Sequence, residues 1–84
     1  MKNSRTEKEV FIRDLYVWRA YMKPNFKYSK VAGELNIHRT TVYSAMRRCV
    51  IREKLDQNFR RLIQKITFTE NFEEFKRINA NLFK

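Results

Sequence analysis

Residues 28 to 48 contain two runs of helical apolar spacing on either side of a short break, and this pattern constrains the fold more than any other feature. The apolar positions are Val31, Ala32 and Leu35 before the break, Ile37 within it, and Val42, Ala45 and Met46 after it. Spacings of three and four residues place such side chains on one face of a helix. The sequence therefore predicts a helix over residues 28–35 and another from residue 39, meeting across a tight turn.

The break carries the residue types that a sharp turn between two helices requires. Ala32 offers a small side chain where the two axes come closest, and Gly33 lies beside it. Asn36 tolerates a left-handed backbone, because its short amide can hydrogen-bond locally. Ile37 then fills the gap between the helices. These features together predict a helix-turn-helix.

The outward face of the second predicted helix is polar and basic. Its side chains are donors, acceptors and one aromatic ring, the chemistry that contacts base edges in the major groove of DNA. We expect DNA base contacts from Arg39, Thr40, Tyr43, Ser44 and Arg47. Arg39 is nearest the start of the helix and is the first candidate for a bidentate contact with guanine.

A second set of residues surrounds this face, at the start of the first helix, in the turn and beside the outward residues. Exposed amides and basic groups at such positions favour phosphate, which fixes the register of a protein on DNA. We expect DNA phosphate contacts from Lys27, Tyr28, Ser29, Lys30, His38, Thr41 and Arg48. Two alternatives stay open, because a basic side chain on a solvated face is often a bystander and His38 could instead cap the turn.

The net charge of +10 over 84 residues indicates a polyanionic partner. This charge is unevenly distributed, since residues 69–84 have as many acidic as basic groups and are neutral. The excess of positive charge therefore surrounds the predicted helix-turn-helix, as a surface that binds duplex DNA requires.

Several other classes of function are disfavoured. Cys49 is the only cysteine and His38 the only histidine, so no internal disulfide or zinc cluster can form, and Cys49 is expected as a buried thiol. No nucleophile–base pair, carboxylate pair or glycine-rich phosphate loop indicates an enzyme, and no cofactor is expected. Without a signal peptide or an apolar run near ~20 residues, we expect a cytoplasmic protein and no membrane partner.

The remaining segments predict an all-α fold, a small bundle of about five helices. A first helix over residues 6–22 opens with the capping-box pair Thr6 and Glu9 and ends before Pro24. Its apolar stripe consists of Phe11, Leu15, Trp18 and Met22, flanked by Val10, Val17 and Tyr21. The helix from residue 39 meets no breaker up to residue 54, which leaves its end open.

Two further helices follow. Asp56 is the expected N-cap of a helix that runs to about Ile66 and has Phe59, Leu62 and Ile63 on one face. A last helix is expected from Thr69 and Glu70, with an aromatic stripe. We divide the chain into a DNA-binding domain, residues 1–66, and a C-terminal helix, residues 67–84. That helix either packs on the same core or forms a homodimer or partner interface.

The stretch from Val31 to Arg48 resembles the helix-turn-helix of bacterial and phage DNA-binding proteins. It is most similar to the C-terminal DNA-binding domain of the replication initiator DnaA and the Trp-repressor-like superfamily around it. The matching positions are Thr40, Thr41, Val42, Ala45, Arg47 and Arg48, with Asp56, Phe59, Leu62 and Ile63 resembling the closing helix of that family. The chain departs from the family at His38 and Arg39, which replace an Asp-His pair, and in a turn that is one residue shorter.

The resemblance implies sequence-specific binding in the major groove of double-stranded DNA by residues 6–66. No initiator-type ATPase domain is present, so a role in replication initiation does not follow. We expect a transcriptional regulator or a phage or mobile-element accessory factor. The alternative is a basic protein–protein interaction module or inhibitor that binds an acidic partner and reads no DNA sequence.

Overall fold

A computed structural model describes residues 7–83 of the chain. Within this range the elements are α1 (Glu7–Tyr21), α2 (Tyr28–Leu35), α3 (Arg39–Leu55), α4 (Gln57–Lys65), α5 (Phe72–Ile78) and a short 3-10 helix, η1 (Ala80–Phe83). The expectation of a small all-α bundle is confirmed. Thr6, the first residue of the expected capping box, lies outside the described residues.

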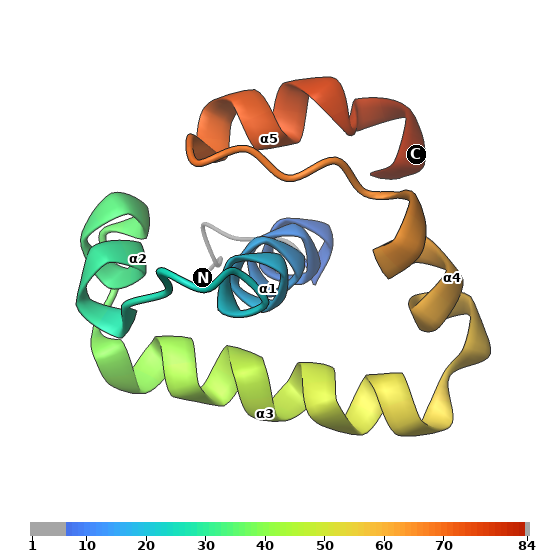
Figure 1. Cartoon of the computed structure of the whole chain (residues 1–84). Coiled ribbons are helices and arrows are strands. Elements are labelled where there is room, and N and C mark those ends of the chain that lie inside the picture. Colours follow the sequence, from blue (N-terminus) through green and yellow to red (C-terminus); the bar gives the residue numbers. More distant parts are fainter. Residues whose placement is uncertain (1–6, 84) are drawn as a thin grey trace, which may run out of the picture.

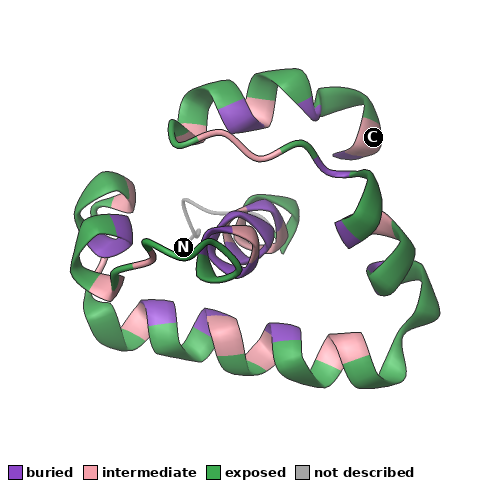
Figure 2. Ribbon diagram, in the orientation of Figure 1, coloured by how far each residue is buried: buried purple, intermediate pink, exposed green. Residues whose placement is uncertain are grey.

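Helix α1 forms the centre of the bundle, and the other helices surround it. Figure 1 shows α1 end-on, with α3 along one side, α5 on the opposite side, and α2 and α4 at the two ends of α3. The consecutive residues Leu15, Tyr16 and Val17 are all buried, so α1 buries more than one face. In Figure 2 the ribbon segments coloured as buried lie mostly on the sides of the surrounding helices that face α1. The sequence pattern predicted only a single broad stripe.

The end of α1 departs from that expected stripe. Tyr21 and Met22 were expected in the core but are exposed. The reason is that α1 ends at Tyr21 and the chain leaves the core there, in a turn whose residues 22–25 are all exposed. The core from this part of the sequence is completed instead by Ile12, Tyr16 and Ala20.

The connection between α2 and α3 has the left-handed residue that the sequence predicts. Asn36 has φ 58° and ψ 48°, and it is the only described non-glycine residue with positive φ. Its N–H donates to the Gly33 carbonyl at 3.2 Å, and the Ile37 N–H donates to the Ala32 carbonyl at 3.0 Å. These bonds satisfy carbonyls that the helix end would otherwise leave open. Gly33 itself is exposed, and a Cβ added there would meet nothing within 4 Å.

Helix α4 begins at the cap that the sequence predicts. The Asp56 carboxylate accepts hydrogen bonds from the N–H groups of Asn58, at 2.9 Å, and Phe59, at 3.2 Å. Phe59, Ile63 and Ile66 then point into the core. The helix before it, whose end the sequence left open, runs on to Leu55.

The start of the last helix was expected at Thr69 and Glu70, and this prediction is wrong. Helix α5 begins at Phe72, with the Asn71 carboxamide accepting from the Glu74 N–H at 2.9 Å. The segment before it is held in a non-helical conformation by buried Asn79. The side chain of Asn79 accepts from the Thr67 N–H at 2.9 Å and donates to the Thr67 carbonyl at 2.9 Å.

The C-terminal segment packs on α1 through aromatic rings. Phe68, Phe72 and Phe75 lie around the Tyr16 ring, with centroid distances of 5.5, 5.0 and 5.1 Å. This places α5 on the side of α1 opposite α3 (Figure 1) and leaves the outer face of α3 uncovered. None of the described helices is long and apolar enough to cross a membrane.

Candidate nucleic-acid interface

Helix α3 is fixed in the bundle by its inward face. Val42, Ala45 and Cys49 are completely buried there, at positions expected from the helical spacing. The Cys49 thiol donates to the Asp14 carbonyl at 3.4 Å. Burial raises the pKa of this thiol from 9.0 to about 12, so Cys49 stays protonated near neutral pH. The expected buried free thiol is confirmed.

An ion pair between α1 and α3 fixes the rotation of α3 about its axis. The Asp14 carboxylate on α1 is almost fully buried and accepts from Arg48 Nε at 2.8 Å and Nη2 at 2.9 Å. Hydrogen bonding to Asp14 raises the pKa of Arg48. Arg48 was expected to contact phosphate, but the structure engages its guanidinium with α1. We therefore assign Arg48 a structural role.

The five residues expected to contact bases lie together on the opposite face of α3. Arg39, Thr40, Tyr43, Ser44 and Arg47 are all exposed. Over residues 7–83, no ion pair engages Arg39 or Arg47. The outer edge of α3 is exposed along its length in Figure 2, and no neighbouring helix covers it. This face is an open polar surface with two unpaired cations.

Tyr43 is the member of this face with a fixed side chain. Its ring packs edge-on against the Tyr28 ring, with centroids 4.5 Å apart. Tyr28 was expected to contact phosphate from the start of α2, and the structure instead half-buries its ring between Tyr43 and Phe26. The contact links the start of α2 to the outward face of α3.

The other residues expected at phosphates are only partly gathered around α3. Lys27 and Ser29 are exposed at the start of α2, where Lys27 is the N-cap residue without a side-chain cap. Lys30 turns toward the C-terminal segment, where its Nζ lies 3.7 Å from the exposed Glu70 carboxylate. Two exposed groups at this distance stabilise the fold little.

The two turn residues differ in exposure. His38 is the exposed N-cap residue of α3, and its carbonyl accepts from the N–H groups of Thr41, at 3.0 Å, and Val42, at 3.3 Å. Its imidazole makes no capping hydrogen bond, so the side-chain cap considered from the sequence does not form. Thr41 is half-buried.

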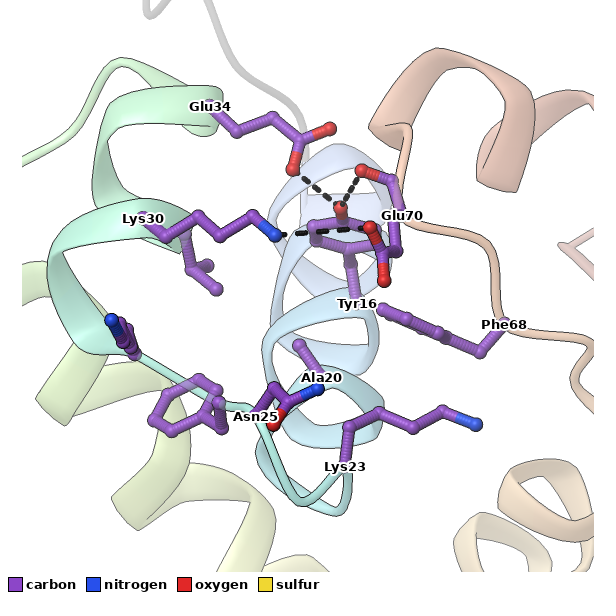
Figure 3. A pocket seen from close by; sticks show the side chains of 11 residues that line it. Tyr16, Ala20, Lys23, Asn25, Lys30, Glu34, Phe68 and Glu70 are labelled. Carbon is purple, nitrogen blue, oxygen red and sulfur yellow. Dashed lines mark hydrogen bonds and ion pairs between the residues drawn. The ribbon is translucent and has the colours of Figure 1, made fainter.

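The structure also brings together residues that the sequence did not single out. A small cavity of about 50 Å³ lies between α1, α2 and the segment before α5. Figure 3 shows Tyr16 at its wall, with its hydroxyl proton shared between Glu34 Oε1, at 2.6 Å, and the Glu70 carbonyl, at 3.0 Å. The other Glu34 oxygen accepts from the Phe72 N–H at 2.8 Å. Burial and the Glu34 carboxylate raise the pKa of Tyr16 above its ordinary value.

The extension of α3 beyond the predicted contact residues is unexpectedly apolar. Val50, Ile51 and Leu55 are exposed, with Ile51 at 57% and Leu55 at 81%. Their helical positions continue the outward stripe of Thr40, Ser44 and Arg47. The signal was present in the sequence, but it required knowing that this helix continues without a break to Leu55.

Comparison of the chain with known proteins finds no matching family model, no matching curated protein and no matching solved structure. The resemblance to the DnaA-like and Trp-repressor-like families therefore stays a prediction.

Proposed function

We propose that this protein binds double-stranded DNA sequence-specifically, with α2 and α3 acting as a helix-turn-helix. The observation that carries the proposal is the outward face of α3. It presents two unpaired arginines with hydroxyl groups and a tyrosine, on a helix whose other face is fixed by burial and by the Asp14–Arg48 ion pair. A helix that reads bases must be held in this way, because base contacts depend on its rotation and register.

The dimensions suit the major groove. An α-helix with its side chains is about 10–12 Å across and the groove is about 12 Å wide. Helix α3 has 17 residues and is about 25 Å long. Its first turns therefore enter the groove while its C-terminal half extends beyond it.

Each outward residue has a role that follows from its chemistry. Arg39 donates two parallel hydrogen bonds to a guanine, and the methyl group of Thr40 contacts a thymine methyl. Tyr43 contacts a base edge or a phosphate, and Ser44 and Arg47 contact bases one turn further along. Each good base contact contributes about 1–3 kcal/mol of discrimination.

The proposed phosphate contacts come from the starts of α2 and α3. Lys27 and Ser29 supply charge and hydroxyl groups at the start of α2, where the exposed amides also favour an anion. Lys30 can exchange its weak contact with Glu70 for a phosphate. His38 and Thr41 add phosphate contacts from the start of α3. Such a domain would serve as a transcriptional regulator or as a phage or mobile-element accessory factor.

Selection of bound duplexes from a random pool, read by sequencing, tests the proposal. We expect enrichment of a defined motif, and a palindrome with half-sites ~34 Å apart would indicate a homodimer. Binding through six or more phosphates should weaken by about 10³ or more between 50 and 200 mM salt. Micromolar or weaker binding that is equal for all sequences would exclude a specific reader.

A second candidate is a protein-interaction module, and the exposed Val50, Ile51 and Leu55 favour it. These side chains lie beside the basic face, an arrangement that suits an acidic amphipathic partner. The selection experiment distinguishes the two candidates, because a protein-interaction module enriches no DNA motif. Salt would weaken the ionic part of its contact with an acidic partner but not the apolar part.

A further inference from the structure

A continuous series of aromatic rings joins the core to the outer face of α3. The rings belong to Trp18 and Tyr21 on α1, Phe26 before α2, Tyr28 on α2 and Tyr43 on α3. Successive centroids are 5.5, 5.4, 4.8 and 4.5 Å apart. We call these five residues the aromatic strip.

The strip is not simply part of the core, because two of its five rings are exposed to solvent. Trp18 is buried, and Phe26 and Tyr28 are half-buried. Tyr21 and Tyr43 are 45% and 42% exposed, although each is held in place by a neighbouring ring. Two aromatic side chains of fixed orientation are thus presented to solvent, with rings packed between them.

Two basic residues are close to members of the aromatic strip in the sequence. Lys27 lies between Phe26 and Tyr28 in the sequence, and Arg39 lies one helical turn before Tyr43 on α3. Both cations are exposed, and neither makes an ion pair within the described part of the chain. Aromatic rings beside cations bind single-stranded nucleic acid, because the bases stack on the rings while the phosphates meet the charges.

We propose that the aromatic strip binds unpaired bases of single-stranded nucleic acid, with Tyr21 and Tyr43 as its stacking surfaces. The site accepts any base, since every base has a flat π-face that can stack on a ring. An apolar protein partner fits less well, because it would leave Lys27 and Arg39 without counterions. The strip shares Tyr43 and Arg39 with the proposed duplex-binding face, but Tyr21, its other stacking surface, lies on α1 outside that face.

The test measures binding of the full chain to labelled oligothymidylate of about twelve nucleotides. An abasic oligonucleotide of the same length retains the phosphates and removes the bases. We expect the oligothymidylate to bind about tenfold or more tightly than the abasic strand, and to change the fluorescence of Trp18, the only tryptophan. An oligouridylate arm shows whether RNA binds as well as DNA.

Substitutions at Tyr21 test whether the preference for strands with bases comes from the aromatic strip. Tyr21→Leu keeps an apolar side chain against Trp18 but has no ring, and it should lose the preference for strands with bases. Tyr21→Phe keeps the ring and should retain that preference. Ile78→Ala, which changes a similarly exposed apolar residue on α5, should bind like the unmodified protein. Equal thermal unfolding of the variants shows that they are folded.

Two results would overturn the proposal. Equal affinity for the abasic and base-containing strands would show that only the phosphates are bound. A Tyr21→Leu protein that folds and keeps the full preference would show that the strip serves packing alone. Loss of duplex binding in an Arg39→Ala variant with retained preference for bases would leave this inference intact.

Discussion

A single buried carboxylate orients the helix that we propose reads DNA. Asp14 lies on α1 and, within residues 7–83, forms an ion pair with Arg48 on α3. The carboxylate is nearly inaccessible, whereas the Arg48 side chain remains 41% exposed. The pair is therefore asymmetric, because the arginine can be hydrated without its partner and the aspartate cannot.

This asymmetry predicts unequal effects of removing each partner. Arg48→Ala leaves an unpaired buried charge and should lower the free energy of unfolding by about 3–5 kcal/mol. Asp14→Ala removes the buried charge and should cost less, because the guanidinium can then reach water. Urea unfolding of both variants and of the double variant measures the difference. Equal losses, or a greater loss for Asp14→Ala, would contradict this account of the pair.

Because its thiol is buried, Cys49 should make the folded protein less stable in alkaline solution. Its pKa is raised from 9.0 to about 12, so above pH 9 the unfolded chain releases a proton that the folded chain retains. The free energy of unfolding should then fall by about 1.4 kcal/mol per pH unit from this thiol. The raised pKa of Tyr16 acts in the same direction above its ordinary value of 10.0.

Urea unfolding between pH 8 and pH 11 checks this prediction, with Cys49→Ala as the control. The substitution lowers stability near neutral pH, but its decline above pH 9 should be shallower. If the free energies of unfolding of the two proteins fall in parallel with pH, the thiol does not contribute to the alkaline loss of stability.

Among the elements, the α2–α3 turn depends on the left-handed residue at its first position. Asn36→Gly should unfold at nearly the same urea concentration as the unmodified chain, because glycine adopts this conformation freely. Asn36→Ala should lower the free energy of unfolding by about 1 kcal/mol, since the alanine Cβ disfavours a positive φ. An alanine variant as stable as the glycine variant would exclude backbone strain as the determinant of this turn.

The sequence predicted those parts of the fold that local chemistry determines. The bounds of α2, the left-handed Asn36 and the Asp56 cap each depend on residues a few positions apart. The outward set on α3 follows from helical periodicity alone, and all of its members are exposed. These features need no knowledge of how the helices pack.

The features of the structure that the sequence did not predict depend on contacts between distant segments of the chain. The late start of α5 follows from the hydrogen bonds of Asn79 to Thr67, and the engagement of Arg48 follows from Asp14 on another helix. The burial of Tyr16 requires the aromatic residues of the C-terminal segment to fold back over α1. Pairings of this kind have no local sequence signal, because either partner alone is an ordinary surface or core residue.

The two sides of the molecule differ in charge. Helix α3 lies on one side of α1 with an open, basic outer face, and α5 lies on the other side within the neutral segment of the chain (Figure 1). Arg77 on α5 is exposed and pairs with Glu74 at 2.9 Å. It provides a cation matched to Arg39 in charge but placed away from the proposed interface.

Comparison of Arg39→Ala with Arg77→Ala on the selected duplex and on a scrambled duplex tests the central claim most directly. We predict that Arg39→Ala loses about 1–3 kcal/mol of the preference for the selected duplex, whereas Arg77→Ala keeps the full preference. If both variants keep the full preference, or both lose it equally, α3 does not read the DNA sequence through this face.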